Sequence, residues 1–180
     1  MTLRGTLGLL VLALASGVGG YAAFHLVQNH SASTTTVPAV APASISLTDL
    51  SGATRSLGEW RGRWLLVNFW ATWCPPCVKE IPVLVDAQKR WGARGLQVIG
   101  PAMDEAAPVR TMAERLGINY PVMAGDVDVS AAMTALGDTL GALPYSVLIA
   151  PDGKVVHHQH GEFDAVKLEK LLKEHVKADF

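Results

Sequence analysis

The two cysteines of this chain, Cys74 and Cys77, are separated by Pro75 and Pro76 and follow directly on a nearly continuous apolar run. The residues after them have the apolar periodicity of a helix, so the pair is predicted to lie where a strand ends and a helix begins. The first turn of a helix has unpaired backbone N–H groups and a partial positive charge, which favour a thiolate over a thiol. Because the thiolate is the attacking species in disulfide exchange, we predict that Cys74 is the nucleophile and Cys77 the resolving thiol.

A CxxC pair also occurs as half of a zinc site, but a closed zinc site needs four ligands and the sequence has no second such pair. His157, His158 and His160 are the side chains that could complete one, and alternation places His158 and His160 on one face of a strand. A solvent-exposed hairpin without function explains these histidines more simply. We therefore predict no metal and no cofactor, and two buried, inert cysteines remain the other alternative.

The elements that must position the cysteines follow from the periodicity of the apolar residues. Trp64–Trp70 has the pattern of a strand buried on both faces, and the residues after Cys74 that of an amphipathic helix. Ser51 and Gly52 mark a short hairpin within Ile45–Leu57. Further strands are predicted at 96–100, 120–123, 145–149 and 155–158, and further helices at 106–116, 129–136 and 163–176. This alternation predicts an α/β fold with a mixed central sheet flanked by helices.

The N-terminus has the composition of a targeting segment. Arg4 is the only charged side chain before residue 30, and residues 5–24 form an uncharged run long enough to cross a bilayer. We interpret residues 1–28 as a membrane anchor, with a cleaved signal peptide and a secreted soluble protein as the alternative. The positive-inside rule then places the rest of the chain on the periplasmic side of an inner membrane. Residues 29–45 are predicted to be a flexible linker, which leaves 46–180 as the folded domain.

Composition excludes two other classes of protein. The 15 Lys and Arg residues are balanced by 16 Asp and Glu residues, so the chain lacks the basic excess of a nucleic-acid-binding protein. Only two cysteines occur among 180 residues, whereas a small secreted domain held together by disulfides has more of them, spread along the chain. The pair is therefore interpreted as local chemistry.

The segment Phe69–Pro82, which contains WCPPC with a glutamate three residues later, resembles the active-site segment of the TlpA/ResA/CcmG group of thioredoxin-like proteins. The resemblance extends from about Ser46 to the C-terminus. Gly141–Ile149 is similar to the segment of that group that carries a cis-proline beside the active site. Leu96–Val122 is similar to the strand–helix insert that separates the group from plain thioredoxins. The resemblance implies a thioredoxin-like fold with an N-terminal hairpin and this insert.

The resemblance also implies roles for individual residues. Leu143–Pro144 should be a cis peptide bond that faces the redox-active disulfide of the two cysteines and binds substrate chain; the alternative is an ordinary trans proline. Glu80 should be a partly buried acid that moves protons for the cysteines; the alternative is a surface glutamate paired with nearby cations. Trp73 should cover the sulfurs, or else fill the core.

The function that the resemblance implies is a membrane-tethered, periplasmic thiol–disulfide oxidoreductase that reduces client proteins. The clients of the group are apocytochrome c thiols or cysteines of copper-site assembly. The sequence has no further cysteine pair, so electrons must come from another protein, which we expect to be a membrane thiol donor. The alternatives are a general oxidase, a copper-binding assembly factor of the Sco type and a peroxiredoxin-like peroxidase. The two-residue spacer argues against the Sco type, which normally has CxxxC.

Overall fold

The structure is a computed structural model, which describes Tyr21 and residues 41–176. The predicted anchor lies outside the described residues apart from Tyr21, and so does the predicted linker up to residue 40. Among the described residues, no helix is long and apolar enough to cross a membrane. The elements described here belong to Ala39–Phe180, the second of the two units into which the chain divides.

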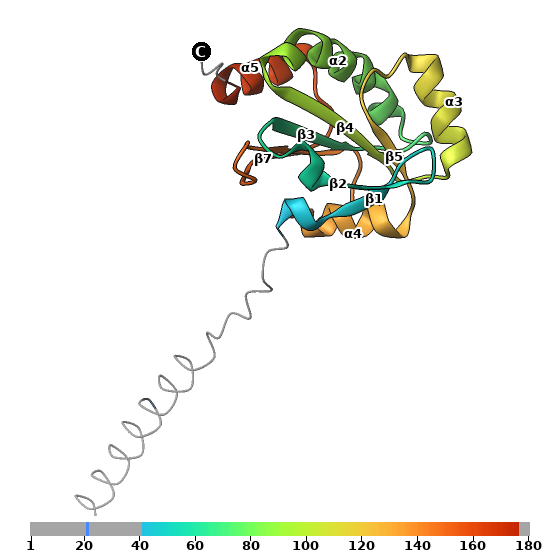
Figure 1. Cartoon of the computed structure of the whole chain (residues 1–180), viewed down its shortest axis with the longest axis horizontal. Helices are drawn as coiled ribbons and strands as arrows, with labels where there is room; N and C mark the ends of the chain where they lie inside the picture. Colours follow the sequence, from blue (N-terminus) through green and yellow to red (C-terminus); the bar gives the residue numbers. More distant parts are fainter. Residues whose placement is uncertain (1–20, 22–40, 177–180) are drawn as a thin grey trace, which may run out of the picture. The chain divides into compact units, whose positions relative to one another are not determined.

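A five-stranded mixed sheet forms the centre of the fold (Figure 1), with the strand order β5-β4-β3-β6-β7. β3 and β5 each pair with β4 in parallel, whereas β6 is antiparallel to both β3 and β7. The strands are β3 (Trp64–Phe69), β4 (Leu96–Ala102), β5 (Val122–Ala124), β6 (Tyr145–Ile149) and β7 (Val155–His160). The predicted α/β fold with a mixed central sheet is therefore confirmed.

The sheet buries both of its faces, which explains why the sequence of β3 is apolar apart from Asn68. Leu66 points to the face covered by α2, α3 and α5, whereas Leu65 and Val67 point to the face covered by α4 and the N-terminal hairpin. The helices are α2 (Pro75–Trp91), α3 (Ala106–Leu116), α4 (Val127–Ala135) and α5 (Ala165–His175), and the hairpin strands are β1 (Ser46–Thr48) and β2 (Thr54–Ser56). The predicted hairpin and the predicted strand–helix piece, now β4 and α3, are both present.

Residues 42–45, which composition assigned to the predicted linker, take part in the fold. Pro42–Ser44 is a turn of 3-10 helix, and Ile45 is buried in the core on the α4 side of the sheet. The hydroxyl of Ser56 donates a 2.7 Å hydrogen bond to the carbonyl of Ala43, which ties this turn to the end of β2. A contact between residues so far apart in sequence leaves no trace in local composition, so Pro42 to Ile45 looked like linker.

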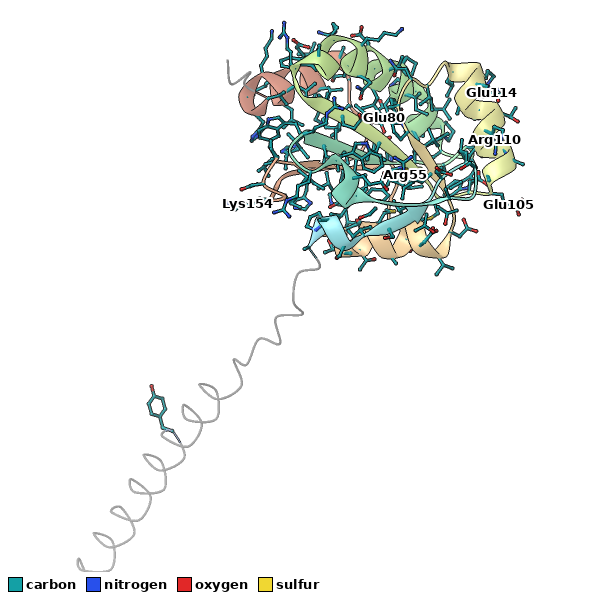
Figure 2. The ribbon with its side chains drawn as sticks, in the orientation of Figure 1. Arg55, Glu80, Glu105, Arg110, Glu114 and Lys154 are labelled. Atoms are coloured by element: carbon teal, nitrogen blue, oxygen red, sulfur yellow. A yellow bond between two sulfur atoms is a disulfide. The ribbon has the colours of Figure 1, made fainter. Side chains whose placement is uncertain are left out.

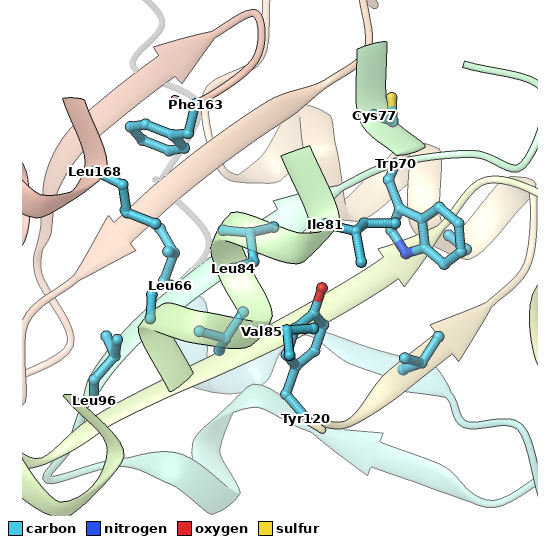
Figure 3. Packing of buried hydrophobic residues seen from close by; sticks show 14 of the residues in the cluster. Leu66, Trp70, Cys77, Ile81, Leu84, Val85, Leu96, Tyr120, Phe163 and Leu168 are labelled. Carbon is cyan, nitrogen blue, oxygen red and sulfur yellow. The ribbon is translucent and has the colours of Figure 1, made fainter. Parts of the chain in front are cut away.

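Substitution of Leu84 measures how much the packing of α2 against the sheet contributes to stability. Its side chain has no exposed surface and packs in the same cluster as Leu66 (Figure 3). We expect Leu84→Ala to lower the free energy of unfolding by about 2–5 kcal/mol, because it removes buried methyl groups and leaves a cavity. Denaturant unfolding of the oxidised protein measures this. Val166→Ala on α5 is the control, since Val166 is 81% exposed and its loss should change stability by less than about 0.5 kcal/mol. Equal effects of the two substitutions would contradict the assigned packing.

Candidate active site

Cys74 and Cys77 form a disulfide across the first turn of α2, with their Cα atoms 5.1 Å apart. Cys74 is the N-cap residue, and its Sγ accepts a hydrogen bond from the backbone N–H of Cys77 at 3.3 Å. The two prolines occupy the first helical positions, where a missing N–H costs nothing. Cys74 is 6% exposed and Cys77 is fully buried, so Cys74 is the cysteine of the pair that retains exposed surface. The predicted position at a strand–helix junction is confirmed.

The loop between β3 and α2 is fixed from both sides, which holds Cys74 in place. The backbone N–H of Trp70 donates to the carbonyl of Pro101, and the carbonyl of Trp70 accepts from Met103. The Trp70 indole donates to the carbonyl of Gly100 at 3.2 Å. A Cβ on Gly100 would lie 3.0 Å from the Tyr120 ring and 3.3 Å from the indole nitrogen, so any larger residue would require these two rings to shift.

Glu80, on α2 (Figure 2), is buried, with 1% of its surface exposed, and its carboxylate contacts Phe163, a member of the apolar cluster that also contains both cysteines. It lies three residues after Cys77 and therefore on the same side of α2. Its Oε1 accepts a 2.6 Å hydrogen bond from the side-chain amide of Asn68, and its Oε2 accepts a 2.7 Å bond from the backbone N–H of Phe163. The alternative of a surface glutamate paired with cations is therefore wrong. Lys79, its neighbour, pairs instead with Glu162 at 2.5 Å.

The environment of Glu80 raises its pKa to about 7, chiefly because burial penalises the charged form. The hydrogen bonds from Phe163 and Asn68 oppose this rise, as does the positive charge of Lys167, whereas the negative charge of Glu162 adds to it. A carboxyl group whose pKa lies near neutral pH can both accept and release a proton under physiological conditions. Such a group is suited to general acid–base chemistry.

The peptide bond between Leu143 and Pro144 is cis, as the resemblance implied. β6 follows it directly, and the pairing of Tyr145 with Phe69 places it at the end of the sheet where β3 leads into the CxxC loop. The carbonyl of Pro144 accepts a 3.0 Å hydrogen bond from Gly161. Substrate binding by Leu143 and Pro144 stays a prediction.

The residues before this proline form an exposed loop. The buried carboxylate of Asp138 accepts hydrogen bonds from the backbone N–H groups of Leu140 and Gly141, at 3.0 and 2.9 Å. Leu140 is 66% exposed, and Trp73 in the CxxC loop is 64% exposed. The exposure of Trp73 excludes the core-filling alternative, and its role as a cover for the sulfurs remains untested.

The histidines of β7 have partners in the fold. His158 and His160 lie on one side of the strand, as predicted, because both rings lie against the ring of Tyr145, with centroids 6.2 and 4.8 Å away. His158 Nδ1 and the Tyr145 hydroxyl are 2.7 Å apart, and the same hydroxyl donates to the carbonyl of Leu136. Within residues 41–176 and Tyr21, no group of three or more His, Cys, Asp or Glu side chains is arranged to hold a metal ion.

Sequence reasoning missed two polar residues of this site, Asn68 and Ser146. Both are buried between the sheet and α2, with 0% and 1% of their surfaces exposed, and the Asn68 amide also donates to Ser146 Oγ at 2.9 Å. The available signal was the single polar residue, Asn68, in the otherwise apolar run of β3. A polar residue within a fully buried strand needs a hydrogen-bonding partner in the core, and here that partner is Glu80.

The fold and the disulfide at the start of α2 together define the class: the protein is a thioredoxin-fold thiol–disulfide oxidoreductase. Comparison with known proteins agrees. The chain is 33% identical over 129 residues to the thiol-disulfide oxidoreductase ResA of Bacillus thuringiensis (strain Al Hakam). The aligned region covers 71% of this chain and 72% of that protein. It is 30% identical over 165 residues to the thiol-disulfide oxidoreductase ResA of Geobacillus kaustophilus, and this alignment covers 91% of this chain and 90% of that protein.

A crystal structure of a thioredoxin-family thiol:disulfide interchange protein from Chlorobium tepidum is similar, with 31% identity and a TM-score of 0.67. The superposed region covers 75% of this chain and 94% of the chain from Chlorobium tepidum. The family model described as AhpC/TSA matches residues 37–158. The chain therefore belongs to the AhpC/TSA family, and it is a thiol–disulfide oxidoreductase of the ResA type.

Proposed function

We propose that this protein is a membrane-tethered, periplasmic reductase that reduces disulfides of client proteins through its CxxC dithiol. The observation that carries the proposal is the buried Glu80 carboxyl on the same side of α2 as Cys77, with a pKa raised to about 7. Cys77 is fully buried, so its thiol needs a base within the protein before it can attack. Glu80 is that base in our proposal.

The reaction starts from the dithiol form of the protein. The Cys74 thiolate attacks a client disulfide; one client sulfur leaves as a thiolate and the other is joined to Cys74. Glu80 then takes the proton of the Cys77 thiol, and the Cys77 sulfur attacks the Cys74 sulfur. The bond between Cys74 and the client breaks, the Cys74–Cys77 disulfide forms, and the departing client thiolate takes the proton from Glu80. Two electrons pass from the protein to the client, and the protein ends in the oxidised form.

The client and the electron donor follow from the resemblance and from the cysteine content. The resemblance implies that the clients are apocytochromes c or proteins of copper-site assembly. The two cysteines of the chain are both used in the exchange, so the oxidised form must be reduced by a second protein, which we propose to be a thiol donor in the membrane. Trp73, Leu143 and Pro144 would contact the client chain.

The proposed location depends on the sequence before the folded domain. Arg4 followed by the uncharged residues 5–24 supports an anchor with its basic end in the cytoplasm. Residues 29–41 would then connect the anchor to the domain. Fractionation of cells that express the full chain tests this: we expect the protein in the membrane fraction and its C-terminal domain accessible to protease added to spheroplasts.

The reduction potential of the Cys74–Cys77 pair tests the direction of electron flow. We expect a value near about −270 mV or lower, as for thioredoxin, because a dithiol that reduces clients must be a stronger reductant than they are. Equilibration of the soluble part of the chain from residue 41 with defined ratios of dithiothreitol measures it, once circular dichroism has shown that this part is folded. A value near about −120 mV, typical of a strong oxidant, would contradict the proposed reductase.

A further inference from the structure

Three polar side chains meet inside the apolar cluster between the sheet and α2: Asn68 from β3, Ser146 from β6 and Glu80 from α2. Each is at most 1% exposed, and both cysteines belong to the same cluster. Asn68 connects the other two, because its amide nitrogen is 2.6 Å from Glu80 Oε1 and 2.9 Å from Ser146 Oγ. The amide is therefore the link between the acid and the sheet.

The side-chain amide of Asn68 makes hydrogen bonds through its nitrogen and none through its oxygen. Both hydrogens of its Nδ2 are used, one for Glu80 and one for Ser146, whereas its Oδ1 accepts none. Across the described residues, Oδ1 is the only fully buried side-chain oxygen or nitrogen without a hydrogen-bond partner. An unpartnered buried acceptor is unfavourable, so this orientation of the amide must be favoured by something else.

The charge of Glu80 explains the orientation. If the amide were reversed, Oδ1 would lie 2.6 Å from a carboxylate oxygen, and two acceptors at that distance repel each other. Pointing Nδ2 at Glu80 instead gives a charge-assisted hydrogen bond, which is stronger than a bond between neutral groups. The amide thus favours the carboxylate form of Glu80 and leaves its own oxygen without a partner.

We propose that Asn68 is a positioning residue for the proton chemistry at Cys77: it holds the Glu80 carboxylate in place and stabilises its charged form inside the core. This inference rests on the proposed role of Glu80 as the base. Without the Asn68 amide, burial would act on the carboxyl with one donor fewer, and less of Glu80 would be ionised at neutral pH.

Other charged and titratable groups also act on Glu80 and must stay unchanged in a test. Glu162, in the segment before α5, disfavours the negative charge of Glu80, and Lys167, in the first turn of α5, favours it. Burial raises the pKa of the Tyr120 phenol, and the negative charge of Glu80 raises it further, so that this phenol remains protonated. Keeping the protein oxidised removes the two cysteine thiols from the titration.

The pKa of Glu80 is therefore to be measured in the oxidised protein by following the side-chain carboxyl carbon of 13C-labelled glutamate by NMR. The variants are Asn68→Leu, which keeps the size of the side chain but removes the donor, and Ser146→Ala, the control. We expect Asn68→Leu to raise the Glu80 pKa by about one to two pH units, the equivalent of one hydrogen bond to a charged group. Ser146→Ala should change it by less than about half a pH unit, because Ser146 contacts only the other hydrogen of the amide.

An unchanged Glu80 pKa in Asn68→Leu would overturn the inference. If that variant does not fold, the wild-type protein still decides: the Asn68 side-chain 15N and 1H resonances must titrate with the same midpoint as Glu80, and resonances that do not move would overturn the inference equally. The outcome is separable from the proposed function, because this titration involves no client. A raised pKa together with an unchanged pH profile of disulfide exchange would retain Asn68 as the partner of Glu80 and reject Glu80 as the base.

Discussion

Replacement of Cys74 by serine is expected to reduce the reduction of insulin disulfides to the rate of the uncatalysed reaction. Cys74 is the sulfur at the N-terminus of α2 that retains some exposed surface, whereas Cys77 has none. A serine hydroxyl stays protonated at neutral pH and cannot form a disulfide with a client. Turbidity of insulin in the presence of dithiothreitol measures the effect, and circular dichroism shows whether the variant is folded. Activity that persists would place the nucleophile elsewhere.

Cys77→Ala is the matched variant, because it keeps the nucleophile and removes only the resolving sulfur. We expect it to accumulate a mixed disulfide between Cys74 and the substrate, since no second thiol is left to displace it. Non-reducing electrophoresis with a fluorescent disulfide peptide should show one labelled band that disappears on reduction. The double variant Cys74→Ser, Cys77→Ala should show none. A labelled band from Cys74→Ser rather than from Cys77→Ala would reverse the order of attack.

The regular elements could be predicted from the sequence because each depends on local pattern. Helix α3 is observed at Ala106–Leu116, the range that its periodicity indicates, and it ends at Gly117, whose φ of 62° a glycine adopts without strain. The buried strand β3 is likewise evident as an apolar run. The strand order is not encoded in this way: β5 pairs with β4 and lies at the edge of the sheet, and the short, apolar sequence of β5 does not identify its neighbour.

The site could be predicted in part, and the division between the parts is physical. Spacing along one helix places Glu80 on the side of Cys77, which needs only the geometry of a helix. Its burial depends on the segment before α5, where the N–H of Phe163, distant in sequence, donates to its carboxylate. Asn68 and Ser146 come from two strands whose pairing is known only from the sheet. The cis bond at Pro144 came from the family resemblance alone, since the residues by themselves favour an ordinary trans proline.

Glu80→Gln is expected to change how stability depends on pH. Because the pKa of Glu80 is about 7 in the folded protein and about 4.3 in an unfolded chain, the folded state binds the extra proton between these values. Stability of the oxidised wild type therefore falls as pH rises from about 4.5 to 7, by up to about 4 kcal/mol from this group, and stays lower above pH 7. Glutamine does not titrate, so the variant lacks this fall. Denaturant unfolding at pH 5 and pH 8 measures the difference between the two proteins; parallel pH curves would place the pKa of Glu80 at its ordinary value.

The same substitution should slow the second step of exchange. With glutamine at position 80 nothing accepts the Cys77 proton, and we expect the release of client from the Cys74 mixed disulfide to be about 10²-fold slower near pH 7.5, within the range for loss of a general base. The wild-type rate should rise with pH through about 7, as Glu80 becomes ionised. The difference between the two proteins should become smaller at alkaline pH, where hydroxide can accept the proton of the Cys77 thiol in place of Glu80. Rapid mixing of the dithiol protein with a fluorescent disulfide peptide resolves this step, and Glu114→Gln on the exposed side of α3 is the control. A Glu80→Gln rate equal to that of this control at every pH would mean that Cys77 loses its proton by another route.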